Sequence, residues 1–303
     1  MAILDEIGAS IRQLAEGAGT SVVGVGQRWG AGSGIVLGEG TVLTNAHNVR
    51  GDKVTVTFAD GRAAEGNVAV RDIDGDLAVI GVDTSGVPAL PWADGVSAEI
   101  GTPVFALANP GGRGLRVTFG FISGVERTFR GPRGRRIAGS LEHTAPLLPG
   151  SSGGPVLTAA GELLGINTNR LGEGFYLALP ADEALRVRAD ALARGESAAS
   201  PRLGVAIAPA SVARRLRRAV GLPDADGLLI RGVIEDSAAA RAGLAQGDLI
   251  VAAAGQPIRT PDDLLEALRA APGATIELSI IRGADERAIQ VPFGDTGQPD
   301  QES

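Results

Sequence analysis

The stretch LLPGSSGGPVL, residues 147–157, places two adjacent serines between two aliphatic runs. Its glycines and prolines do not suit the interior of a strand, because glycine is conformationally free and proline cannot donate a ladder hydrogen bond. The stretch therefore predicts a forced turn that displays Ser151 and Ser152. Glycines on both sides of the serines allow several backbone N–H groups to converge on one point, where they can stabilise an oxyanion.

The composition of the whole chain indicates many tight turns between short strands. The 303 residues include 45 glycines and 17 prolines, roughly a fifth of the chain against about 12% in average usage. Short apolar or alternating runs such as SVVGVG, KVTVTF and RVTFGFIS recur between residues 21 and 179 without intervening helices. This spacing predicts antiparallel barrels or sandwiches rather than a parallel sheet.

The pattern also predicts how the chain is divided. Apolar residues at positions 3, 7, 11 and 14 indicate an amphipathic N-terminal helix that needs a partner surface. A second unit of mixed helices and strands follows the β-rich one, after the flexible stretch ESAASP. The expected segments are a helix at 1–19, a β-rich unit at 20–194, a linker at 195–201, an α+β unit at 202–294 and a disordered tail at 295–303.

Charge and residue usage narrow the classes of function. The net charge of −7 argues against nonspecific nucleic-acid binding, and we interpret the basic clusters at 130–136 and 214–218 as a solvated loop and an outer helix face. With no cysteine and only two histidines, we expect neither a metal site nor a cofactor. The N-terminus lacks the features of a signal peptide, and no run of about 18 apolar residues occurs, so we expect a cytoplasmic protein.

The serine turn has candidate partners upstream in the chain. A serine alone is a weak nucleophile and needs a base that a third group orients. His47 in TNAHNV follows a predicted strand, and Asp76 in GDLAVI precedes another. The order His, Asp, Ser is that of chymotrypsin-type barrels. Ser152 is the better nucleophile candidate than Ser151, because two glycines follow it directly and free its backbone for an exposed turn.

Each candidate also has a plain structural interpretation. His47 could be an ordinary histidine at a strand end, and Asp76 could cap a turn, as Asp72 and Asp74 are expected to do. The residues TNAH and the later serine motif favour the catalytic interpretation for His47, and the position directly before the apolar run LAVI favours it for Asp76. His143, nine residues before Ser152, has no required role, and we expect it to be packed or solvated beside the cleft.

At the level of whole motifs, the chain resembles a known family. TNAHNV, DLAVI, NPGG, RVTFGFISGV, GSSGGP and LLGINT resemble the protease domain of the HtrA (Deg) serine endopeptidases. LGV at 203–205 and the stretch GLLIRGVIEDSAAARAGLAQGDLIVAAAGQPI resemble the PDZ domain that follows it in that family. The resemblance implies a mainly β protein with a chymotrypsin-like double β-barrel protease domain and a C-terminal α+β PDZ domain.

The resemblance also implies roles for the site residues. Ser152 would be the nucleophile, His47 the general base and acid, and Asp76 the carboxylate that holds the imidazole. The backbone N–H groups of Gly150 and Ser152 would form the oxyanion hole, and cleavage would pass through an acyl-enzyme. The substrate pocket is expected from the uncharged residues Pro146, Leu147, Leu148, Gly165, Ile166 and Asn167. Such walls favour small to medium aliphatic side chains in unfolded or exposed polypeptides.

The PDZ-like unit is similar to a groove that takes a peptide C-terminus as an added strand. Its expected residues are Leu203, Gly204 and Val205 on the strand and Leu265 and Leu268 on the helix. Core and groove remain equally open interpretations for Leu264, Leu265 and Leu268.

Two functions therefore follow from the sequence. The first is an ATP-independent serine endopeptidase that acts in protein quality control and is regulated by peptide C-termini at its PDZ domain. The alternative is a chaperone-like or scaffold protein whose triad is held in a resting state. Family members are usually extracytoplasmic, and many are trimers held by N-terminal aromatic residues. Here the first aromatic residue is Trp29, so a homotrimer is possible rather than implied.

Overall fold

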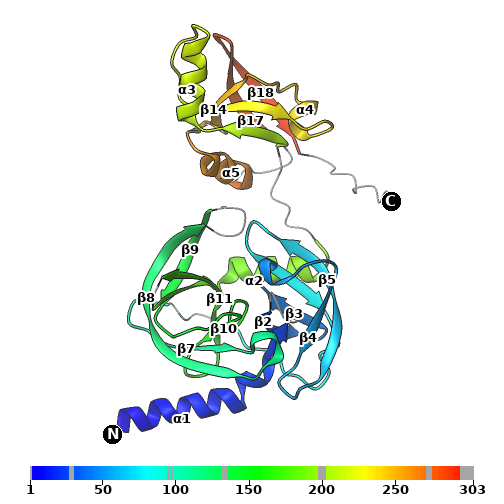
Figure 1. Cartoon of the computed structure of the whole chain (residues 1–303), viewed down its shortest axis with the longest axis vertical. Coiled ribbons are helices and arrows are strands. Elements are labelled where there is room, and N and C mark those ends of the chain that lie inside the picture. Colours follow the sequence, from blue (N-terminus) through cyan, green and yellow to red (C-terminus); the bar gives the residue numbers. More distant parts are fainter. Residues whose placement is uncertain are drawn as a thin grey trace. The chain divides into compact units, whose positions relative to one another are not determined.

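A computed structural model describes residues 2–26, 31–93, 96, 98–130, 136–172, 174–196, 203–270 and 275–293. Residues 1–198 and 199–303 form two compact units (Figure 1). Most of the linker expected at 195–201, the whole tail at 295–303 and most of the basic cluster at 130–136 lie outside the described residues.

The first unit contains two closed antiparallel barrels of six strands each. The first barrel has the order β1-β2-β3-β6-β5-β4. Its strands are β1 (Val22–Val25), β2 (Gly32–Gly38), β3 (Thr41–Thr44), β4 (Lys53–Thr57), β5 (Ala63–Asp72) and β6 (Leu77–Gly81). Its core consists of aliphatic residues around one aromatic side chain, Phe58, which accords with the low aromatic content of the chain.

The second barrel has the order β10-β11-β12-β9-β8-β7. Its strands are β7 (Pro103–Ala108), β8 (Arg116–Arg130), β9 (Arg136–His143), β10 (Pro155–Leu157), β11 (Leu163–Gly172) and β12 (Phe175–Pro180). The short 3-10 helices η1 (Ala18–Ser21), η2 (Ala46–Asn48) and η3 (Pro110–Gly112) lie in the connections of this unit. The predicted double β-barrel is confirmed.

One hydrophobic cluster joins the two barrels. It combines Ile35 and Leu43 of the first barrel with Leu107 and Leu157 of the second, all fully buried. Helix α2 (Glu183–Ala193) lies across the junction of the barrels and adds Leu185, Ala189 and Leu192 (Figure 1). Because the cluster fixes one barrel against the other, the ends of β3 and β6 face the turn before β10.

The N-terminal helix α1 (Ala2–Glu16) is only partly covered by the barrels. Leu14 is buried in the shared cluster and Ile11 packs against it. Ile3, by contrast, is 72% exposed, and the helix extends away from the barrels toward its N-terminus (Figure 1). The barrels therefore provide the predicted partner surface to the C-terminal end of this helix.

The second unit is the predicted α+β domain. Its sheet has the order β13-β14-β15-β17-β18, with β16 paired to β15. The strands are β13 (Val205–Ala208), β14 (Leu228–Val233), β15 (Leu249–Ala253), β16 (Gln256–Pro257), β17 (Thr275–Arg282) and β18 (Asp285–Pro292). The helices are α3 (Ala210–Ala219), α4 (Ala238–Arg241) and α5 (Pro261–Ala270). No helix in the described ranges is long and apolar enough to cross a membrane.

The basic cluster at 214–218 was predicted to lie on the outer face of a helix, and this is correct for only part of it. Arg218 is indeed exposed and Arg214 is half-buried, and they pair with Asp224 and Asp226, respectively. Arg217 instead is buried, and its Nε donates to the Pro223 carbonyl oxygen over 2.9 Å. Local acidic partners therefore neutralise much of this patch.

Candidate active site

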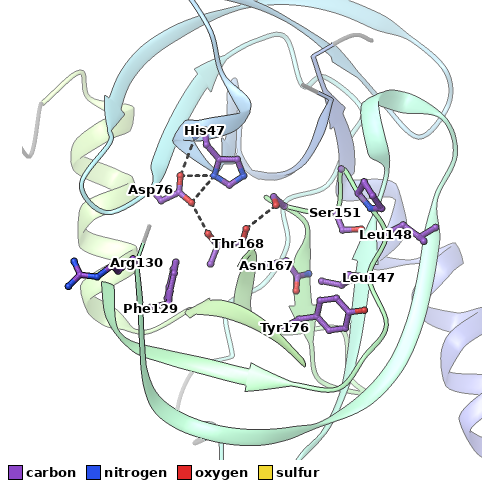
Figure 2. Close-up of a pocket in the computed structure, with 13 residues that line it drawn as sticks. His47, Asp76, Phe129, Arg130, Leu147, Leu148, Ser151, Asn167, Thr168 and Tyr176 are labelled. Atoms are coloured by element: carbon purple, nitrogen blue, oxygen red, sulfur yellow. Dashed lines mark hydrogen bonds and ion pairs between the residues drawn. The ribbon is translucent and has the colours of Figure 1, made fainter. Parts of the chain in front are cut away.

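His47 and Asp76 lie side by side although 29 residues separate them. His47 sits in η2, directly after β3, and Asp76 precedes β6, the strand that pairs with β3. Nδ1 of His47 lies 2.9 Å from both carboxylate oxygens of Asp76 (Figure 2). A carboxylate can only accept, so Nδ1 carries the proton and Nε2 is left with a free lone pair.

The carboxylate of Asp76 is held by three donors. Besides the imidazole, it accepts from the backbone N–H of His47 over 3.2 Å and from the Thr168 hydroxyl over 2.7 Å. Asp76 is fully buried and has a φ of 55°, in the left-handed region that few non-glycine residues adopt. Asp72 has the role expected of a turn cap, because its side chain accepts from the N–H of Gly75.

The serine turn is anchored to the first barrel. The Ser152 carbonyl oxygen accepts from the Ser33 N–H over 2.9 Å and from the Asn48 side-chain amide over 2.8 Å. The Gly150 carbonyl oxygen accepts from the Ser33 hydroxyl over 2.9 Å. Gly153 has a φ of 87°, and a Cβ there would lie 2.0 Å from the Ser33 carbonyl oxygen. Only glycine fits this close approach.

These anchors leave two backbone donors unused. Within the described part of the chain, the N–H groups of Gly150 and Ser152 donate no hydrogen bond. Gly150 has a φ of 89°, in the left-handed region that glycine adopts without steric cost. The two free N–H groups are those expected to form the oxyanion hole.

Thr168 contacts both ends of the site. Its hydroxyl donates to Asp76, and its carbonyl oxygen accepts from the Ser152 hydroxyl over 3.0 Å (Figure 2). The register of β11 against β12 shifts between Asn167 and Asn169. Such a shift re-aims neighbouring side chains, and Asn167 and Thr168 line the same cleft although they are consecutive.

The cleft beside the serine turn has a volume of about 430 Å³. Of the predicted pocket residues, Leu147, Leu148 and Asn167 line it, and Pro146 lines an adjoining hollow of about 310 Å³. Gly165 and Ile166 are not among its walls, because the alternation of β11 directs Ile166 into the buried core. Lining residues that the sequence did not single out are Phe129, Arg130, Pro149, Thr168 and Tyr176.

His143 is packed rather than solvated. It is fully buried, and its ring stacks on Tyr176 with a centroid separation of 5.8 Å. Burial lowers the pKa of His143 to about 4, against an opposing hydrogen bond with Asn167. This histidine is therefore neutral near pH 7.

Known proteins share both units of the chain. A model of the trypsin-like peptidase domain matches residues 32–166, and a model of the PDZ domain matches residues 229–282. The "Putative serine protease HhoA" of Synechocystis sp. is 34% identical over 287 residues, which cover 89% of this chain and 72% of that protein. The chain belongs to the HtrA (Deg) family of serine endoproteases. The HtrA-type protease AlgW, solved with a decapeptide, has a TM-score of 0.71 at 26% identity and covers 93% of this chain and 97% of its own.

A second relative bears on the length of the chain and on its cellular location. The "Probable periplasmic serine endoprotease DegP-like" of Halomonas elongata is 35% identical over 277 residues, 89% of this chain. The chain spans 57% of the length of that protein. Since the relative is named periplasmic, the cytoplasmic location expected from the sequence finds no support in this HtrA relative.

The predicted groove residues in the PDZ unit of this HtrA chain differ in burial. Leu203 and Leu268 are buried in its core, together with Leu264. Gly204 has a φ of 79° and Val205 begins β13, the first strand of the sheet order. Leu265 is only half-buried. The edge strand and Leu265 are thus the parts of the expected groove that a ligand can reach.

Proposed function

We propose that this chain is a serine endopeptidase in which Ser152 attacks the peptide carbonyl, His47 carries the proton and Asp76 orients the imidazole. The observation that carries the proposal is the paired contact of His47 Nδ1 with both oxygens of Asp76, in the cleft that Ser152 also lines. This contact holds the imidazole in the tautomer whose Nε2 can accept a proton.

The reaction then follows from the hydrogen bonds of the site. The Ser152 hydroxyl turns from the Thr168 carbonyl to His47 Nε2, gives up its proton and forms a bond to the substrate carbonyl carbon. The free N–H groups of Gly150 and Ser152 bind the oxyanion as the carbonyl π bond breaks. His47 next protonates the leaving amine as the C–N bond breaks, which leaves an ester on Ser152. Water repeats the steps with His47 as base and releases Ser152 and the new carboxyl end.

One observation favours the alternative of a scaffold with a resting triad. The Ser152 hydroxyl donates to the Thr168 carbonyl oxygen rather than toward the base. Leaving that bond costs about 1 kcal/mol, which a hydrogen bond from the hydroxyl to Nε2 of His47 would offset. Because His47 and Asp76 are already paired in the cleft that Ser152 lines, the endopeptidase is the better-supported function.

The walls of the cleft support an apolar substrate side chain. Leu147 and Leu148 of the turn, together with the rings of Phe129 and Tyr176, give it aliphatic and aromatic surface. Such a pocket discriminates by only ~1–3 kcal/mol per methylene. Unfolded or exposed polypeptides with small to medium aliphatic residues are the substrate class that fits.

The PDZ unit would regulate this activity by binding peptide C-termini. A peptide strand can add to the free edge of β13 beside Gly204, with an apolar terminal side chain near Leu265. The AlgW neighbour is described with a decapeptide, which supports peptides as ligands of such a protein. A homotrimer stays a prediction.

The function is tested with an unfolded protein substrate such as casein, without ATP. Wild-type protein should cleave it, faster in the presence of a peptide with an apolar C-terminus, and Ser152→Ala should lower turnover by on the order of 10⁶. Residual cleavage near the wild-type rate in Ser152→Ala would reject the assignment of the nucleophile. If the wild type suppresses casein aggregation without cleaving it, the scaffold is the correct function.

A further inference from the structure

His143 is a buried ionisable residue that the proposed mechanism does not use. It is the last residue of β9 and pairs with Ile122 of β8 and Tyr176 of β12, so strands flank it on both sides. No part of the residue is exposed to solvent. Burying a polar ring in such a place costs free energy unless the ring forms hydrogen bonds there.

The hydrogen-bond partner of His143 is the side chain of Asn167, 24 residues later. The amide nitrogen of Asn167 donates to the carbonyl oxygens of Gly154 and Pro155, over 3.1 and 3.3 Å. The opposite orientation of the amide would place its oxygen against those two carbonyl oxygens. Oδ1 of Asn167 is therefore the atom that faces His143 Nε2, at 2.9 Å.

This orientation fixes the proton on the imidazole. Because Oδ1 of Asn167 can only accept, Nε2 of His143 carries the hydrogen. Nδ1 then holds a lone pair, and it has no hydrogen-bond partner among the described residues. A proton on Nδ1 would be buried without an acceptor, so the neutral Nε2–H form is the one that fits.

Asn167 connects His143 to the serine turn. The Asn167 carbonyl oxygen accepts from the N–H of Gly153 over 2.7 Å, and its own N–H donates to the Gly154 carbonyl oxygen over 2.9 Å. Gly153 directly follows Ser152. Three bonds from one residue thus hold both glycines that follow the nucleophile, and the bond from His143 prevents the amide from rotating away.

The ring of His143 also supports the wall of the cleft. It stacks on Tyr176 at an interplanar angle of 27°, and Tyr176 and Asn167 both line the cleft (Figure 2). A single buried side chain therefore lies behind two cleft residues and the serine turn.

We propose that His143 is a positioning residue: through Asn167 it fixes the turn that carries Ser152, and through Tyr176 it fixes the adjoining wall of the cleft. The inference rests on the proposed role of Ser152 as nucleophile. His143 itself touches neither the substrate nor the reacting atoms.

The test compares three substitutions by the rate at which a fluorophosphonate phosphonylates Ser152 with loss of fluoride. Leucine removes the donor, glutamine places an amide N–H where Nε2 was, and asparagine is too short to reach Asn167. His143→Gln should stay within a few-fold of the wild-type rate. His143→Leu and His143→Asn should lose on the order of tenfold to a hundredfold, in the first-order inactivation constant kinact rather than in the binding constant KI. Where the leucine variant does not fold, the glutamine and asparagine pair decides.

A double-mutant cycle separates this role from general loss of packing. In an Asn167→Ala background the bond is already absent, so His143→Asn should have little further effect on the phosphonylation rate. Equal phosphonylation rates for wild type, His143→Gln and His143→Asn would overturn the inference, as would equal losses for both variants. If the wild type itself is not phosphonylated, the proposed function fails. The ¹⁵N shifts of His143 in Ser152→Ala then still report whether Nε2 carries the proton.

Discussion

The hydroxyl of Thr168 donates to Oδ2 of Asp76 over 2.7 Å, in a part of the site that solvent does not reach. The same carboxylate oxygen lies 2.9 Å from Nδ1 of His47, so the bond restrains the carboxylate that contacts the imidazole. Thr168→Val keeps the size and the backbone of this residue and removes only the hydroxyl. We expect kcat to fall on the order of tenfold, with Thr168→Ser close to wild type. If the serine variant loses as much as the valine variant, the hydroxyl is not what matters.

Asp76→Asn tests the tautomer of His47. An amide can present its N–H to Nδ1, which would move the proton to Nε2 and leave no acceptor for the Ser152 hydroxyl. The expected loss in kcat is on the order of 10⁴, with little change in the melting temperature. A loss below about tenfold would mean that Asp76 does not set the tautomer.

Gly153→Ala tests the anchoring of the serine turn to the first barrel. The new Cβ would lie 2.0 Å from the Ser33 carbonyl oxygen, so either the turn or β2 must move. We expect a loss of activity on the order of a hundredfold. The matched control is Gly51→Ala, which has a similar φ of 80° but open space around it and should cost only about 1–2 kcal/mol of stability. Equal effects of the two substitutions would contradict the anchoring.

The titration of His143 predicts how stability changes with pH. Its pKa is lowered from 6.5 to about 4 in the folded protein, so the unfolded chain binds the proton first as the pH falls. The stability tied to neutral His143 is present above pH 6.5 and is lost between 6.5 and 4, by up to roughly 3 kcal/mol. Urea unfolding at pH 7 and 4.5 measures this loss. Between the two pH values the free energy of unfolding of His143→Gln should fall less than that of the wild type. Equal decreases in both proteins would show that His143 does not contribute.

Leu265→Gln tests the PDZ groove. Leu265 is half-buried beside the core residues Leu264 and Leu268, so its substitution should spare the fold. We expect the affinity for a peptide with an apolar C-terminus to fall about tenfold, from the loss of apolar contact. Glu266→Gln, at an exposed position of the same helix, is the control and should bind like the parent protein. The titrations are done in Ser152→Ala so that the peptide is not cleaved.

The motifs allowed much of this molecule to be predicted. The glycines around Ser152 and the strands before His47 and after Asp76 carried enough local information for the double barrel and the candidate triad. The sequence did not indicate Thr168 as a site residue, because its position depends on the register shift in β11. That shift arises from pairing between strands. Ile166 was taken for a pocket wall because the direction of a strand's alternation is visible only once the strand is placed.

Other features depend on contacts between distant segments. The bond between His143 and Asn167 joins two strands that meet only through the pairing of β9, β12 and β11. Leu268 resembled Leu265 in the sequence, yet Leu268 is buried in the core of the PDZ unit whereas Leu265 is half-buried. The rotamer of Ser152 is set by the Thr168 carbonyl, which no local pattern can reveal.

In the proposed mechanism His47, Asp76 and Ser152 act together, so Ser152 should be far more nucleophilic than an ordinary serine. Intact-mass analysis after reaction with a fluorophosphonate, followed by peptide mapping, measures this reactivity. We expect one adduct per chain, located on Ser152, absent in Ser152→Ala and formed far more slowly in His47→Ala. Labelling that persists in Ser152→Ala, or that proceeds in His47→Ala at the wild-type rate, would contradict it.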